Sequence, residues 1–157
     1  MFAMVKNKNS RNAKEKRRGK LMSTETKGIR VRYNWLKFMY AYTIVLAGGI
    51  GLALLVVPSI ALNLFGYPAE EPIMAGVGYS VFLAFAILSI LGLRAPLKFS
   101  IVLLLQLTYK VIWFIAIIIP LLIAGQLPSY AVVTSIIFAT FVIGDLIAIP
   151  FRYLFAK

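Results

Sequence analysis

Four long apolar stretches, separated by short joints, dominate the chain after its first 35 residues. They cover about residues 36–57, 73–93, 99–124 and 130–151. Each has roughly 20 residues or more, enough for a helix rising about 1.5 Å per residue to cross about 30 Å of hydrocarbon. The alternating strands of about ten residues that a β-barrel needs are absent. The pattern predicts an all-α, polytopic membrane protein, a bundle of four transmembrane helices.

Turn-forming residues and charges mark the joints between the stretches. Glu70 and Glu71 lie in the first joint, and residues 125–129 form an uncharged third joint. The positive charges of the second joint and of the C-terminal tail are Arg94, Lys98, Arg152 and Lys157. Positive charge next to a span favours the cytoplasmic side. Since the basic N-terminus falls on the same face, we expect both termini to be cytoplasmic.

Residues 1–32 carry most of the basic side chains of a chain whose formal net charge is +12. They lack apolar periodicity, so we expect a disordered cytoplasmic tail, followed by the four-helix domain over residues 33–157. The tail is too long and basic for a secretory signal, and Met22 offers a second plausible start. Clustered Lys and Arg attract anionic lipids by about 1 kcal/mol each. Nucleic acid is not an expected partner because the tail has no binding fold.

The amino-acid composition limits the kinds of site that the chain can form. Hydrophobic residue types make up 61% of the chain and charged types 14%, against roughly a quarter charged in a soluble domain. Cysteine and histidine are absent, which excludes thiol nucleophiles, Cys/His zinc sites, iron–sulfur clusters and the usual general base near neutral pH. We therefore expect no metal, no cofactor and no catalytic residue set.

Small residues recur at four-residue spacing in two of the stretches, as they do where helices approach closely in lipid. The two sets are Gly76, Ser80 and Ala84 in the second stretch, and Thr140, Gly144 and Ala148 in the fourth. Each set lies on one face of its helix and is expected to seat a neighbouring helix. A homodimer, or a place in a larger membrane complex, is an open alternative.

Lys110 and Asp145 are ionisable residues inside the third and fourth predicted spans. A charge at this depth costs several kcal/mol unless it is paired, hydrated or able to snorkel. Lys110 lies roughly 16 Å and Asp145 roughly 9 Å from the cytoplasmic end of its helix. The tilt of the Cα–Cβ bonds and the long lysine stem reduce the difference in depth between the two charged groups. Lys110 and Asp145 are therefore each other's first candidate for an ion-pair partner.

Other polar residues extend this candidate intramembrane site. Gln106 lies one turn before Lys110, Tyr109 lies beside it, and Tyr79 of the second stretch can face the same interior. Three interpretations stay open. The charged pair fixes the packing of two helices, or the residues line a pocket for a small molecule, a lipid head group or a proton, or the two charges snorkel separately.

Three short runs resemble the DoxX-like group of small four-helix membrane proteins. They are residues 91–96 (Leu-Gly-Leu-Arg-Ala-Pro), 109–114 (Tyr-Lys-Val-Ile-Trp-Phe) and 144–151 (Gly-Asp-Leu-Ile-Ala-Ile-Pro-Phe). The resemblance covers about residues 37–155. It implies architecture only, because the group is functionally mixed and none of the runs is a catalytic motif.

These observations leave three functional hypotheses. The first is a non-enzymatic structural or accessory component of a membrane, expected to be the plasma membrane of a prokaryote. The second is a small-molecule or proton-coupled binding or transport protein that uses Lys110 and Asp145. The third and least favoured is a membrane enzyme with acid–base chemistry at Tyr79, Tyr109 and Lys110, which no residue spacing supports.

Overall fold

A computed structural model describes residues 31–68 and 72–155, which form helices and no strand. Within this part of the chain, four helical stretches are long and apolar enough to span a membrane. They are Tyr33–Val56, Pro72–Arg94, Ser100–Ile123 and Ser129–Ala148. The predicted all-α fold with four membrane-spanning helices is confirmed.

The first and third spans each contain a π-helical turn. The first span consists of α2 (Tyr33–Thr43), η1 (Ile44–Gly48) and α3 (Gly49–Val56). The third consists of α6 (Ser100–Trp113), η2 (Phe114–Ile118) and α7 (Ile119–Ile123). Pro120 accounts for η2, because proline has no N–H and its ring would clash with the carbonyl of Ala116 in a regular helix. The wider turn lets the span continue past the proline.

The second and fourth spans, α5 (Pro72–Arg94) and α8 (Ser129–Ala148), are uninterrupted. The α8 helix ends three residues before the expected Phe151, because the residue before a proline avoids the helical conformation. Ile149, which precedes Pro150, accordingly has an extended ψ of 124°. Two short helices, α4 (Pro58–Phe65) and α9 (Phe151–Leu154), complete the order.

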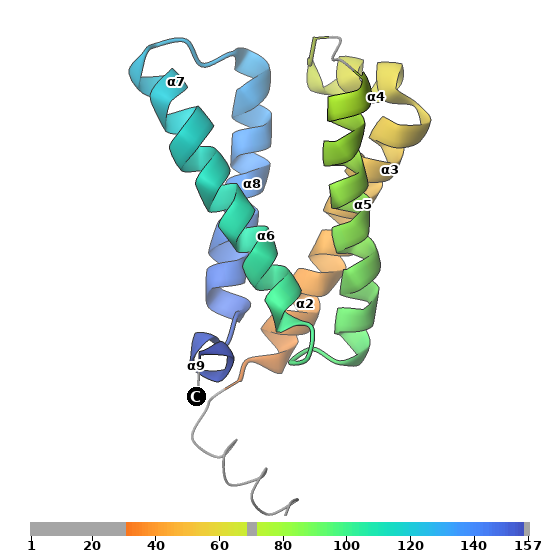
Figure 1. Cartoon of the computed structure of the whole chain (residues 1–157), viewed down its shortest axis with the longest axis vertical. Coiled ribbons are helices and arrows are strands. Elements are labelled where there is room, and N and C mark those ends of the chain that lie inside the picture. The colour runs from red at the N-terminus through yellow and green to blue at the C-terminus, as the bar shows by residue number, and fades with distance from the viewer. Residues whose placement is uncertain (1–30, 69–71, 156–157) are drawn as a thin grey trace, which may run out of the picture. The chain divides into compact units, whose positions relative to one another are not determined.

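Residues Arg32–Ile149 form one compact unit, and every contact described from here on lies inside it. The first span packs along α5, and α6 packs along α8. Because α2 also contacts α6 and α8, the two helix pairs meet near α2. Figure 1 shows the pairs diverging from the α5–α6 joint toward α4 and α7. We call the two ends of the unit the Arg94 end and the Tyr67 end.

Glycines allow the close approach of the first span to α5. A Cβ on Gly48 would lie 2.8 Å from the Cβ of Ala86, and a Cβ on Gly51 would lie 3.0 Å from the carbonyl oxygen of Tyr79. Neither distance leaves room for a larger residue. The small residues of the first span therefore seat α5, as backbone proximity in lipid requires.

Gly92→Ala is expected to destabilise the unit by about 1–3 kcal/mol. The new Cβ would lie 2.5 Å from the Tyr40 ring. That ring is fully buried, and its hydroxyl donates to the carbonyl oxygen of Pro96 at 2.8 Å, so it has little freedom to move. Gly49→Ala is the matched control, because nothing lies within 4 Å of its Cβ. The control should gain up to about 1 kcal/mol in helix propensity. Unfolding by denaturing detergent, followed by circular dichroism, measures both, and equal stabilities would contradict this packing.

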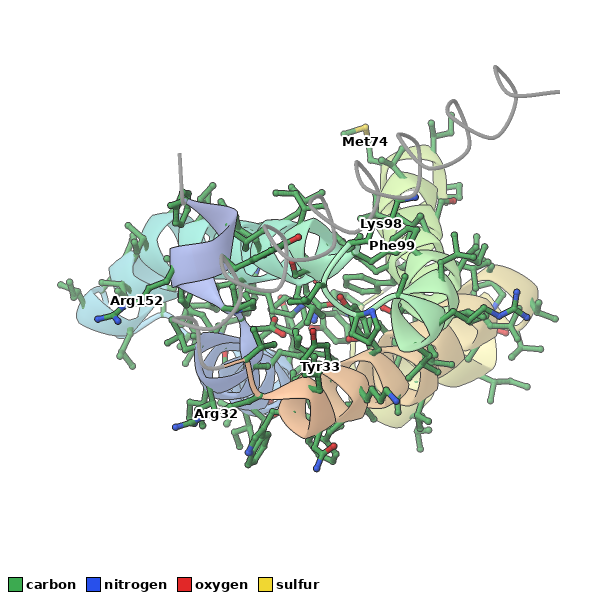
Figure 2. All side chains as sticks on the ribbon, turned by 90° about the horizontal axis from the view of Figure 1, so that it is seen from below. Arg32, Tyr33, Met74, Lys98, Phe99 and Arg152 are labelled. Atoms are coloured by element: carbon green, nitrogen blue, oxygen red, sulfur yellow. The ribbon has the colours of Figure 1, made fainter. Side chains whose placement is uncertain are left out.

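Positive side chains lie at the Arg94 end. Figure 2, seen from that end, shows Arg32 at the start of α2 and Lys98 in the joint between α5 and α6. Both are exposed. Among the described residues, the loops and short helix at the Tyr67 end carry no charged side chain. The two ends of the unit therefore differ in charge.

Candidate functional site

Four polar side chains form a buried cluster between α2, α6 and α8. The members of this polar cluster are Thr43, Gln106, Lys110 and Asp145, and each is at most 1% exposed. Gln106 Nε2 donates to Thr43 Oγ1 at 3.3 Å and to Asp145 Oδ2 at 3.2 Å. Thr43 Oγ1 in turn donates to the carbonyl oxygen of Met39 at 2.8 Å. The bonds of Gln106 thus connect three of the four spans.

Helix geometry accounts for the position of each member of the cluster. Gln106 and Lys110 are one turn apart on α6, so their side chains leave the same face. On α8, Gly144 comes directly before Asp145, and a Cβ at Gly144 would collide with the Met39 thioether on α2. The glycine therefore lets α2 approach α8 closely enough for the Gln106 amide to donate hydrogen bonds to both Thr43 and Asp145.

Lys110 forms no hydrogen bond with Asp145, its first candidate partner from the sequence. Its Nζ is buried and has no hydrogen-bond partner among the described residues. It lies instead 4.3 Å from the ring centre of Phe141, 4.4 Å from that of Tyr109 and 5.2 Å from that of Phe138. Ring faces attract cations, so the three rings supply part of the stabilisation expected of the carboxylate.

Three polar atoms of the cluster are buried without a partner among the described residues. They are Gln106 Oε1, Lys110 Nζ and Asp145 Oδ1. Buried polar groups are nearly always hydrogen-bonded, and an unsatisfied one costs about 1–3 kcal/mol. One of the three atoms is a donor and two are acceptors, so their bonding capacities are complementary.

Thr43→Val is expected to destabilise the unit by about 1 kcal/mol, because valine keeps the volume but cannot accept from Gln106. The matched control is Thr108→Val. Thr108 is exposed, and its hydroxyl donates to Leu104 of its own helix at 2.8 Å. Unfolding by denaturing detergent compares the two variants. An equal loss of stability in both would show that the bond between Thr43 and Gln106 contributes nothing.

A cavity of about 670 Å³ lies between the two helix pairs, toward the Tyr67 end. Residues of all four spans and of α4 line it, and none of them is charged. The polar groups in its wall are the indole of Trp113 and the hydroxyls of Tyr67, Tyr79, Tyr109, Tyr130 and Thr134. Met74 and Val81 at its edge are 74% and 42% exposed. The cavity therefore reaches the surface of the unit, where the chains of a bilayer would lie.

Aromatic rings separate this cavity from the polar cluster. Tyr109 and Phe138 line the cavity and also lie against the Lys110 ammonium. Phe138 packs edge to face with Trp113 at 5.0 Å and with Phe82 at 6.2 Å between ring centres. We call Phe82, Tyr109, Trp113 and Phe138 the aromatic floor. The ammonium thus lies one layer of rings below the cavity.

At the other end of the cavity, Tyr67 connects the two helix pairs. It follows α4, its hydroxyl is hydrogen-bonded to that of Thr134 on α8, and its ring centre lies 4.8 Å from that of Tyr130. We call Tyr67, Tyr130 and Thr134 the hydroxyl rim. The rim places uncharged hydrogen-bonding groups opposite the aromatic floor.

The structure divides the five residues of the predicted polar site between two places. Gln106, Lys110 and Asp145 belong to the polar cluster, and Tyr79 lines the cavity. Tyr109 lies between the two, because its ring lines the cavity and also lies against the Lys110 ammonium. The residues predicted for a single site are therefore divided between a buried cluster, a cavity and the aromatic floor that separates them.

The small residues of α8 lie against α2. Gly144 and Ala148 are buried, with Gly144 next to Met39. Thr140 is hydrogen-bonded to the hydroxyl of Tyr42 at 2.6 Å. The neighbour that this set seats is thus a helix of the same chain.

The small residues of α5 lie on an outer face. Ser80 and Ala84 are exposed, and nothing lies within 4 Å of a Cβ built on Gly76. No helix among the described residues packs on this face at Gly76. The expected close helix contact is therefore not made within the described part of the chain.

Thr43, Phe138 and Phe141 were not among the residues predicted for the polar site. A threonine in an apolar helix commonly bonds its own backbone, so nothing in the sequence marked Thr43 as a partner of Gln106. Phe138 and Phe141 lie seven and four residues before Asp145, on one helical face. That spacing was a usable signal for rings beside the buried charges. No group of three potential metal ligands is found in the described residues.

Comparison of the chain with protein-family models, with curated proteins and with solved structures finds no match. The resemblance to DoxX-like proteins therefore stays a prediction. The geometry of the cluster and of the cavity is what bears on function.

Proposed function

We propose that the chain is a non-enzymatic integral membrane protein that binds an apolar, chain-bearing molecule of the bilayer in the cavity. The observation that carries this proposal is the cavity itself, with its volume of about 670 Å³ and its uncharged wall formed by all four spans. Pockets for small molecules typically measure about 300–1,000 Å³ and are mostly apolar. The cavity favours the binding hypothesis over a purely structural role.

The depth of the cavity fits a lipid chain. Tyr130 at the rim and Phe138 at the floor are eight residues apart on α8, which is about 12 Å along a helix. One leaflet contributes about 15 Å of hydrocarbon. A chain that enters from the leaflet at the Tyr67 end would therefore reach the aromatic floor.

The chemistry of the wall favours an uncharged head group. Tyr67, Tyr130 and Thr134 present hydroxyls at the rim, and no lining residue carries a charge that would pair with an ionic group. Apolar surface buried at the floor supplies the affinity, and the hydroxyls orient the molecule. A long-chain alcohol or a monoacylglycerol has this combination of groups.

In this proposal the polar cluster has a structural role. It joins α2, α6 and α8 below the floor through the two bonds of Gln106. The helix pairs are thereby held together at the Arg94 end and can diverge around a ligand at the Tyr67 end.

The charge distribution gives an expected orientation. Arg32, Arg94 and Lys98 lie at the Arg94 end, which we expect to face the cytoplasm. The cavity would then open in the opposite leaflet. The plasma membrane of a prokaryote stays the expected location, with anionic lipids beside the basic end.

Fluorescence of Trp113 tests the proposal, because this residue lines the cavity. The chain has two tryptophans, and Trp35→Phe leaves Trp113 as the sole reporter. A long-chain alcohol brominated at the end of its chain quenches tryptophan on contact. In nanodiscs we expect the quenching to saturate as the mole fraction of this probe rises. Quenching that rises without saturation would report only random lipid contact and would contradict the proposal.

A further inference from the structure

The polar cluster carries unmet bonding capacity on three of its side chains. Both hydrogens of the Gln106 amide are engaged, one with Thr43 and one with Asp145, so its Oε1 is left to accept from another group. Asp145 accepts from Gln106 through Oδ2 only, and its Oδ1 is buried and unpartnered among the described residues. Lys110, one turn along the same face of α6, has an ammonium with three N–H donors.

Cation–ring attraction does not meet this capacity. The rings of Tyr109, Phe138 and Phe141 stabilise the charge of the ammonium, but a ring face is a weak acceptor, and rings offer nothing to the two oxygens. In a buried site, polar groups that find no partner in the protein are usually joined by an ordered water with about three hydrogen bonds.

We infer that Lys110, Gln106 and Asp145 bind one water molecule, which accepts from Lys110 Nζ and donates to Gln106 Oε1 and Asp145 Oδ1. This water satisfies all three unpartnered atoms at once. It also joins the two charged residues as a water-mediated ion pair in place of a direct one. The site lies on the far side of the aromatic floor from the cavity, so it is independent of any ligand bound there.

Hydroxyl-radical labelling by X-ray radiolysis tests this inference on the full chain in nanodiscs. Radicals formed from a buried water oxidise the side chains that touch it, even where bulk solvent has no access. Phe141 is 2% exposed and lies 4.3 Å from the Lys110 ammonium, so it is the reporter. We expect Phe141 to be oxidised in the wild-type protein within a brief exposure.

Two variants show where the label comes from. Lys110→Met/Asp145→Leu replaces both charges by apolar groups, a change that buried pairs often tolerate, and should abolish the oxidation of Phe141. Ser89→Ala removes another buried, unpartnered oxygen, on α5, and should leave the oxidation unchanged.

Three results would overturn the inference. The first is a wild-type Phe141 that stays unmodified, which decides the question without any variant. The second is a double variant labelled as strongly as the wild type. The third is an equal loss of label in Ser89→Ala, which would show that the loss is not specific to this site.

Discussion

Asp145→Leu is expected to destabilise the four-helix unit by about 3–5 kcal/mol, the range found when one partner of a buried charge pair is removed. The substitution leaves the Lys110 ammonium fully buried with no carboxylate from the described residues near it, and it removes one of the two acceptors of Gln106. Unfolding of the protein in mild micelles by added denaturing detergent, followed by circular dichroism, measures the loss.

Two further variants separate this effect from the loss of a charge in general. Lys98→Met removes an exposed lysine at the Arg94 end and should change stability by no more than about 0.5 kcal/mol. Lys110→Met/Asp145→Leu removes both buried charges and should be more stable than Asp145→Leu alone. If Asp145→Leu were as stable as Lys98→Met, the polar cluster would not hold the helix pairs together.

Gly78→Leu is expected to weaken binding of a chain-bearing ligand by at least about tenfold, or roughly 1.4 kcal/mol. Gly78 lines the cavity, and nothing lies within 4 Å of a Cβ built on it. A leucine side chain at this position therefore extends into space that the ligand would occupy, without a clash in the folded protein. Saturable quenching of Trp113 by the brominated alcohol, in the Trp35→Phe background, measures the affinity.

Gly76→Leu is the matched control for this prediction. Gly76 is two residues away on α5, its Cβ also meets nothing within 4 Å, and it does not line the cavity. Both variants add the same group to the same helix, so they share any effect on helix propensity or on insertion. Equal binding by Gly78→Leu and Gly76→Leu would place the ligand outside the cavity.

The four spans were predictable because their signals are local. Length and continuous hydrophobicity locate a membrane helix, and prolines and glycines near its ends limit it. Pro58 begins α4, and Gly66, with φ of 70°, ends it. The end of α8 differed from the expectation because the effect of Pro150 begins one residue earlier, at Ile149.

The contents of the polar cluster were only partly predictable. Depth along each span brought Lys110 and Asp145 to one region, but it does not determine where a long flexible side chain ends. The ammonium lies among three rings and not on the carboxylate, and Gln106 takes the place beside Asp145 that lysine was expected to fill. Side-chain competition of this kind depends on three helices at once.

No pattern in the sequence predicted the cavity. It exists because the helix pairs diverge, and the divergence depends on which small residues seat a neighbour. Gly144 on α8 lies against α2, whereas Gly76 on α5, with the same four-residue spacing, lies against nothing within 4 Å. Identical spacing of small residues thus gives opposite outcomes on α8 and α5. Helix packing in lipid depends on the surface of the neighbouring helix as well as on the small residues themselves.

The most direct test of the binding site is native mass spectrometry of the protein released from nanodiscs that contain a long-chain alcohol. We expect one retained alcohol per chain on the wild-type protein and on Gly76→Leu, and none on Gly78→Leu. Release of the wild-type protein without bound alcohol, or equal retention by all three proteins, would contradict the account of the cavity as a binding site.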